Sequence, residues 1–240
     1  MKKILAIFIL MMFISPAQAF FKKKEVQTGP EYYSDTEYTT PIEAKQKPKW
    51  KPDEEQDPTD SHSKYKKVTK DTIIMEALEM LSGTAGEFSQ DAILGNNLSE
   101  KPIMIEFANL SNFDIKYTNF DALGWKQKGR LYIYINVKHQ DAPKEALAAL
   151  LAHEAIHQDE LNSLNEETYA WTLEAVVWQQ LLEENPEIAR IEHPLVEREN
   201  IINKLFVKGN YTNEYIRKSV ISNIGYQSLP SRSPGFEDDK

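Results

Sequence analysis

A strand pattern directly followed by an alanine-rich helix pattern constrains the fold of this chain more than any other feature. Leu131–Val137 alternates aliphatic residues with aromatic and polar ones, and such β-branched and aromatic segments favour a β-strand. The segment from Lys144 to Asp159 follows, and its run Ala146–Ala152 has high helix propensity. Asp141-Ala142-Pro143 marks the start of this helix with an N-cap candidate and a proline. The small side chains let neighbouring elements pack closely against it.

Further helices and strands are predicted on both sides of this pair. A Ser163–Glu166 capping box precedes a second helix, which ends at Asn185-Pro186. We therefore expect an α+β domain, in which a small β-sheet packs on the alanine-rich helix and on the helix after it, with further C-terminal helices. The other predicted elements are helices over Asp71–Leu81, Glu166–Glu184, Pro194–Val207 and Asn213–Ser222, and short strands over Pro102–Phe107 and Phe113–Tyr117.

The first nineteen residues form the pattern of a secretory signal. Lys2 and Lys3 precede an apolar run of eleven residues, Ile4–Ile14, and Ala17-Gln18-Ala19 gives a small-residue exit. A membrane anchor is the alternative, but a spanning helix needs roughly 20 apolar residues. We expect cleavage after Ala19, a periplasmic or secreted protein, and no stable membrane insertion afterwards.

The composition changes along the remaining chain and predicts its domain boundaries. Residues 20–67 are rich in Pro, Lys and Tyr and poor in aliphatic side chains, which predicts a disordered leader or linker. Its tyrosines and Trp50 leave open the alternative of an arm that docks on a partner or lies across the folded domain. Residues 68–227 then form the folded domain, and residues 228–240 a flexible tail.

Charge and cysteine content exclude several classes of function. The formal net charge is −9, whereas a general nucleic-acid binder needs a basic face, so we expect no nucleic-acid partner. The chain has no cysteine, which excludes disulfides, thiolate metal sites and cysteine nucleophiles.

The alanine-rich helix carries an H-E-x-x-H motif, His153-Glu154-Ala155-Ile156-His157. Residues four apart lie on the same face of a helix, so the two imidazoles can hold one Zn²⁺. From its position beside His153, Glu154 can accept a proton from a water that the zinc activates. The alternative is a helix whose histidines are solvated or make ordinary core hydrogen bonds.

A catalytic zinc site usually has three protein ligands, so the motif needs one more. Glu167 opens the second helix, which can fold back along the first, and it is the preferred third ligand. A first-turn acid favoured by the helix dipole is its alternative role. Glu166 is better explained by the capping box, and Glu174 is a candidate partner for a histidine's other nitrogen, or a solvated or core-edge residue. The remaining ligand candidates are Glu160 and His193.

The motif His153-Glu-Ala-Ile-His157 together with Glu167-Thr-Tyr-Ala170, ten positions after His157, resembles the gluzincin zinc metallopeptidases, in particular their minimal members. The resemblance implies that His153, His157 and Glu167 bind zinc and that Glu154 is the general base. It also implies a small sheet whose edge strand binds the peptide or protein substrate, and Leu131–Val137 matches that place in the sequence. The oxyanion-stabilising residue of that group has no single match, and Tyr211, Tyr215, Tyr226 and His193 are the candidates.

These observations predict an exported zinc-dependent metallopeptidase. A non-catalytic periplasmic binding or assembly protein that contains zinc is the alternative, and a fourth protein ligand in place of an open position would favour it. A third hypothesis is an enzyme held latent by its leader.

Overall fold

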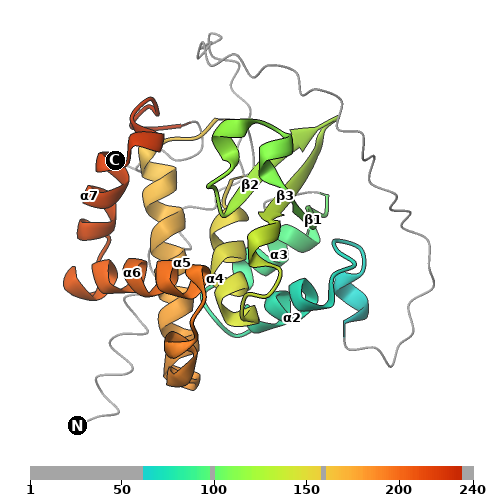
Figure 1. Cartoon of the computed structure of the whole chain (residues 1–240), viewed down its shortest axis with the longest axis horizontal. Coiled ribbons are helices and arrows are strands. Elements are labelled where there is room, and N and C mark those ends of the chain that lie inside the picture. Colours follow the sequence, from blue (N-terminus) through green and yellow to red (C-terminus); the bar gives the residue numbers. More distant parts are fainter. Residues whose placement is uncertain (1–61, 98–100, 158–160, 234–240) are drawn as a thin grey trace. The chain divides into compact units, whose positions relative to one another are not determined.

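The structure, a computed structural model, describes residues 62–97, 101–157 and 161–233. Within these residues six α-helices and one three-stranded sheet confirm the α+β class (Figure 1). The sheet packs over α4, and α4 and α5 lie side by side (Figure 1). The helices are α2 (Thr72–Met80), α3 (Glu87–Leu94), α4 (Lys144–Glu154), α5 (Leu164–Glu184), α6 (Pro194–Lys208) and α7 (Glu214–Ser222), and the strands are β1 (Met104–Ala108), β2 (Ala122–Gln127) and β3 (Arg130–Asn136).

Strand β3 is the middle strand of the sheet. It pairs in parallel with β1, from Met104 opposite Tyr132 to Ala108 opposite Asn136. It pairs antiparallel with β2 on its other side, so both of its edges are hydrogen-bonded. The expectation that Leu131–Val137 is an edge strand, to which a substrate could add, is therefore wrong, because an added strand needs a free edge. Among the described segments, none pairs with the outer edge of β2.

The structure contains a β2–β3 hairpin that was not predicted from the sequence. Its two-residue turn places Lys128 and Gly129 at φ values of 52° and 73°, as a type I′ turn requires. No strand is predicted from the sequence over β2. A strand is predicted over Phe113–Tyr117 instead, and this is wrong: the segment ends in a 3₁₀ turn over Ile115–Tyr117, capped by the side chain of Asp114.

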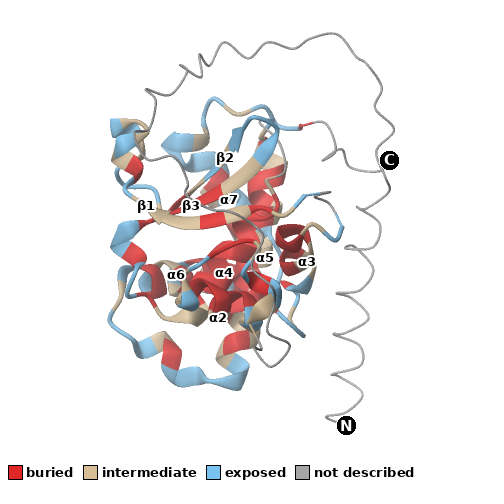
Figure 2. Cartoon of the chain, turned by 90° about the vertical axis from the view of Figure 1, so that its right-hand side faces the viewer, coloured by how far each residue is buried: buried red, intermediate tan, exposed pale blue. Residues whose placement is uncertain are grey.

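Helix α4 runs through the centre of the domain. Every residue from Ala146 to Ala152 is at most 1% exposed, because α2, α5 and the sheet surround the helix (Figure 2). The alanine run is thus explained by close packing on all sides. The helix begins at Lys144, with Pro143 at the N-cap position in place of the expected Asp141.

Helix α4 ends at Glu154, earlier than the predicted Asp159. Beyond it, the backbone N–H groups of Ile156 and His157 donate to the carbonyls of His153 and Glu154, three residues back, which tightens the last turn. The segment has no glycine or proline to signal this end. His157 therefore lies just after the helix, on a turn, while His153 lies in its last full turn.

The other helix predictions agree with the structure to within two residues at each end. Ser163 caps α5 by accepting a hydrogen bond from the Glu166 N–H, which is one half of the predicted capping box. The other half is not formed, because the Ser163 N–H donates to Asn162 Oδ1 and not to the Glu166 side chain. Gly209 ends α6. Short α3 was not predicted.

Both predicted domain boundaries lie inside the folded part of the chain. Residues 62–67 were assigned to the leader, yet Ser63–Tyr65 is a 3₁₀ turn and Tyr65 is fully buried in the core. Residues 228–233 were assigned to the tail, yet the carbonyl of Pro230 accepts a hydrogen bond from the Leu164 N–H and Ser233 is 3% exposed. The expectations for residues 1–61 and 234–240 lie outside the described residues. Within the part of the chain that the structure describes, no helix has the length and apolar composition needed to cross a membrane.

Candidate metal centre

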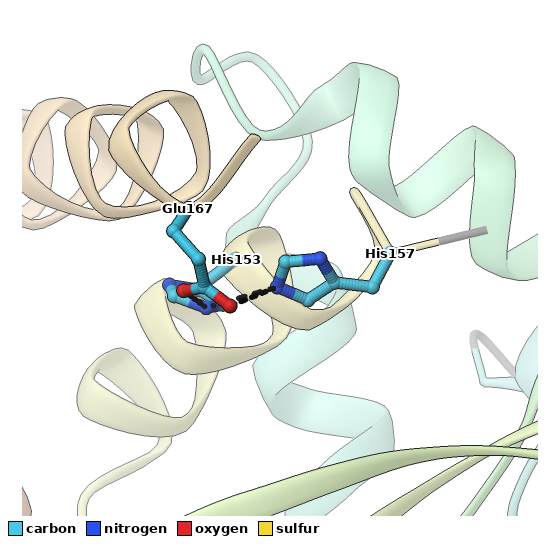
Figure 3. A group of neighbouring side chains, drawn as sticks. All are labelled: His153, His157 and Glu167. Atoms are coloured by element: carbon cyan, nitrogen blue, oxygen red, sulfur yellow. Dashed lines mark hydrogen bonds and ion pairs between the residues drawn. The ribbon is translucent and has the colours of Figure 1, made fainter. Parts of the chain in front are cut away.

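His153, His157 and Glu167 meet at one point between α4 and the start of α5 (Figure 3). The Nε2 atoms of the two histidines are 3.3 Å apart. Glu167 places Oε2 3.8 Å from Nε2 of His153 and Oε1 3.7 Å from Nε2 of His157. The structure thus brings together the three residues that the sequence analysis named as metal ligands.

The spacing of these atoms fits a metal ion. Tetrahedral ligands that lie about 2.0–2.1 Å from a zinc ion are about 3.3 Å from one another. Glu167 Oε2 is buried and has no hydrogen-bond partner among the described residues, which is costly for a carboxylate oxygen. A divalent cation at this point would satisfy that oxygen and both Nε2 atoms, so the donor set fits zinc.

The orientation of His153 is fixed by Glu174. Nδ1 of His153 lies 2.9 Å from Oε2 of Glu174, and that glutamate is completely buried on α5. With Nδ1 as the donor, Nε2 is left as the nitrogen with a free lone pair, which is the form that binds a metal. The sequence analysis left Glu174 open between this role and a solvated or core-edge position, and the structure places it beside the ring.

The orientation of His157 is fixed by Glu166, which the sequence analysis assigned only to the capping box. Nδ1 of His157 lies 3.0 Å from Oε1 of Glu166. The other oxygen of this carboxylate accepts a hydrogen bond of 2.8 Å from Ser233 Oγ. Burial disfavours the charged form of His157, but Glu166, Glu167 and Glu154 outweigh it and raise the pKa of the imidazole to about 9. The surrounding carboxylates thus favour a positive charge here, which in the metal-free protein is a proton on the imidazole.

Glu154 lies beside the three ligands without joining them. Its side chain is 9% exposed, and no hydrogen bond to it is formed by any group in the described residues. Burial raises the pKa of its carboxyl, and the neighbouring His153 and His157 oppose that shift. A buried, unpaired carboxylate with a raised pKa is suited to accept a proton.

Glu167 has two further polar neighbours. Asn162 Nδ2 donates a hydrogen bond to Oε1 of Glu167. Tyr226 is half-buried, and burial together with the charge of Glu167 raises the pKa of its hydroxyl. Tyr226 is also held by Trp171, whose Nε1 lies 3.4 Å from the tyrosine oxygen.

The other residues considered from the sequence lie elsewhere. His193 caps α6 through Nδ1, and its Nε2 lies 3.5 Å from Asp141. Tyr215 packs between Lys208 and Lys218 on the α6–α7 surface. Glu160 lies outside the described residues. Tyr211 packs against the ring of Phe206. Of the four candidates for the oxyanion-stabilising group, Tyr226 is therefore the one shown next to a metal ligand, Glu167.

Strand β2 passes beside the candidate site. A Cβ atom added to Gly124 would lie 4.0 Å from the Cβ of His157. The absence of a side chain at this position leaves the space next to the histidine open, and Gly124 itself is exposed.

The comparisons with known proteins add no relative to this picture. No protein-family model, curated protein or solved structure matches the chain. The candidate site therefore stands on the chemistry and geometry of its own residues.

Proposed function

We propose that this chain is a zinc-dependent metallopeptidase of the gluzincin type. The convergence of three ligand atoms from His153, His157 and Glu167, at separations of 3.3–3.8 Å, carries the proposal. In the described residues this group has three members, which leaves one coordination position for water or substrate. Three protein ligands and an open position are typical of catalytic zinc, whereas a fourth protein ligand is typical of structural zinc.

The residues around the ligands supply the groups that peptide hydrolysis needs. When bound, zinc polarises a carbonyl oxygen and lowers the pKa of a water molecule. Glu154 accepts the proton of the attacking water on its carboxylate and delivers it to the leaving amine nitrogen. Glu174 and Glu166 hold the two imidazoles in the orientation that exposes Nε2.

Tyr226, a neighbour of Glu167, supports the same reaction. We assign its hydroxyl as the donor to the oxygen that becomes negative when water attacks the peptide carbonyl. The raised pKa of this hydroxyl keeps it protonated, as a donor must be.

The substrate is expected along β2 rather than β3. Among the described residues, the outer edge of β2 has no paired strand, as an extended peptide needs, and β2 passes His157 at Gly124. Backbone pairing along this edge would bring a peptide carbonyl next to the ligands with little dependence on its side chains. The signal pattern over residues 1–19 supports the proposal that this activity lies in the periplasm or outside the cell.

A non-catalytic zinc protein is the second candidate. Its specific support is the burial of the centre, since Glu166, Glu167 and Glu174 are all at most 4% exposed. The unpaired carboxylate of Glu154 favours the enzyme, because a structural site has no use for a buried base.

The experiment that separates the two is hydrolysis of a set of quenched fluorescent peptides by the zinc-loaded chain and by Glu154→Gln. The variant should keep its zinc and lose about 10²–10⁴-fold in rate. Glu145→Gln, at the other end of α4, is the matched control and should cleave like the wild type. Equal rates for Glu154→Gln and the wild type would contradict the mechanism, and zinc binding without any cleavage would favour the second candidate.

A further inference from the structure

Arg198 on α6 lies outside both sequence motifs, yet its guanidinium contacts carboxylates from three segments of the chain. Nη2 lies 3.1 Å from Oε2 of Glu174, and Nη1 donates to the other oxygen of the same carboxylate. Nη1 also lies 2.9 Å from Oε1 of Glu199, and Nε lies 3.3 Å from Oδ2 of Asp121. The forked contact with Glu174 is a geometry that arginine provides and lysine does not.

The first of these contacts leads to the metal centre. Oε2 of Glu174 accepts hydrogen bonds from both Arg198 Nη2 and His153 Nδ1. A single oxygen therefore connects the guanidinium to His153, a proposed metal ligand. Glu174 is completely buried. The direction of its carboxylate, and with it the rotation of the His153 ring, depends on the guanidinium.

The second contact leads to the free strand edge. Asp121 directly precedes β2, and its carboxylate also holds His139 Nε2 at 2.7 Å and Lys138 Nζ at 2.9 Å. Its backbone carbonyl accepts a hydrogen bond from the Asn136 N–H at the end of β3. The position of Asp121 therefore sets where β2 begins, three residues before Gly124.

We propose that Arg198 is a positioning residue that orients His153 through Glu174 and fixes the start of β2 through Asp121. One guanidinium then couples the ligand geometry to the strand that flanks the site. The part of this inference that concerns zinc rests on the proposed function, whereas the orientation of His153 is a property of the metal-free protein as well.

A purely structural role is the competing explanation. The Cζ atom of Arg198 lies over the Trp171 ring, 5.7 Å from its centroid, and this contact joins α6 to α5. Loss of that role alone would lower stability without changing the zinc affinity of the folded protein. The test therefore measures zinc affinity, by competition with a chelator, in folded Arg198→Met. We expect affinity about 10–100-fold weaker than in the wild type. Arg190→Met, which removes an exposed arginine paired with exposed Glu187, is the control and should bind zinc normally.

Two further experiments separate the contact of Arg198 with Glu174 from its contact with Asp121. In a Glu174→Gln background, Arg198→Met should weaken zinc binding no further, because both changes break the same link. Asp121→Asn should speed amide hydrogen exchange along Ala122–Gln127 and change zinc affinity less than threefold. Arg198→Lys keeps the charge without the fork, and should show intermediate zinc affinity even if Arg198→Met does not fold.

Three results would overturn the proposal. They are wild-type zinc affinity in Arg198→Met or Arg198→Lys, losses that multiply in the double variant with Glu174→Gln, and an unchanged NMR signal from the His153 Nδ1 proton in the metal-free variants. The last measurement needs no metal. If the wild type binds no zinc the proposed function fails, but this signal still decides the role of Arg198.

Discussion

Glu166 and His157 are joined by a hydrogen bond of 3.0 Å between Oε1 and Nδ1, and Ser233 Oγ donates to the second oxygen of the same carboxylate. A proposed metal ligand is thus connected, through one glutamate, to the segment at the C-terminal end of the described chain. The helix cap does not use this side chain, because it is the Glu166 N–H that donates to Ser163 Oγ. The two roles of Glu166 can therefore be tested separately.

Glu166→Gln should weaken zinc binding about 10–100-fold while leaving the α5 cap intact. The amide has one acceptor oxygen, so it cannot receive both His157 Nδ1 and Ser233 Oγ as the carboxylate does. Competition with a chelator gives the affinity, and circular dichroism reports the helix content. Glu184→Gln, an exposed change on the same helix, is the control. Unchanged affinity in Glu166→Gln would show that the bond does not orient His157.

Ser233→Ala should lower the free energy of unfolding by about 1–3 kcal/mol, because a buried carboxylate oxygen loses its donor. Urea unfolding of the variant and the wild type measures this difference. The change also tests whether residues 228–233 belong to the folded domain. A stability equal to that of the wild type would mean that this segment is not held against α5 in solution.

Strand β2 was not predicted, and the reason lies in its composition. Ala122–Gln127 contains Gly124, Lys126 and Gln127, which have low β propensity, so pairing with β3 rather than local preference makes it a strand. Leu131–Val137 was predicted as a strand because its side chains alternate, but alternation does not tell a middle strand from an edge strand. The edge position was therefore assigned to the wrong strand.

The residues of the candidate centre also fall into two groups, those that local sequence predicts and those that only the folded chain brings together. His153 and His157 were predicted from the helix repeat, although His157 lies on the turn just after α4, and Glu167 was predicted from its place at the start of the next helix. Local sequence was therefore enough to name them. Glu166, Arg198 and Ser233 reach the centre through contacts between distant segments. Neither Arg198 nor Ser233 lies in any pattern that marks its partner, and such contacts are visible only in the folded chain.

Two glycines of the β2–β3 hairpin have different roles, since Gly124 lies beside the candidate site and Gly129 lies in the turn. Gly124→Ala should leave the fold intact, because the added methyl meets His157 Cβ at an ordinary contact distance of 4.0 Å. The same methyl occupies space beside the ligands, so we expect a higher KM for peptides with little change in stability. Gly129→Ala should instead cost about 1 kcal/mol, because φ is 73° at that position. Peptide kinetics and urea unfolding test the pair, and an equal KM for Gly124→Ala and the wild type would remove β2 from the substrate site.

Stability at acid pH should depend on Asp121. Burial raises the pKa of its carboxyl, but His139, Arg198 and Lys138 outweigh burial and hold the pKa below its usual value. The group therefore stabilises the fold above the unfolded-state pKa of about 3.9, and this contribution is lost as the pH falls below that value. Asp121→Asn should flatten the fall in the free energy of unfolding between about pH 5 and pH 2. Asp141→Asn, with a side chain 88% exposed, should leave the acid profile unchanged. An equally steep profile in Asp121→Asn would contradict this assignment.

The most direct test of the proposed centre is the metal content of the purified wild type and of Glu167→Ala, measured by mass spectrometry under native conditions. We expect one zinc per wild-type chain and loss of that zinc in the variant, because Glu167 supplies the third ligand. Full zinc in folded Glu167→Ala would remove Glu167 from the ligand set. A folded wild type that takes up no zinc would contradict the metal centre itself, and with it the peptidase.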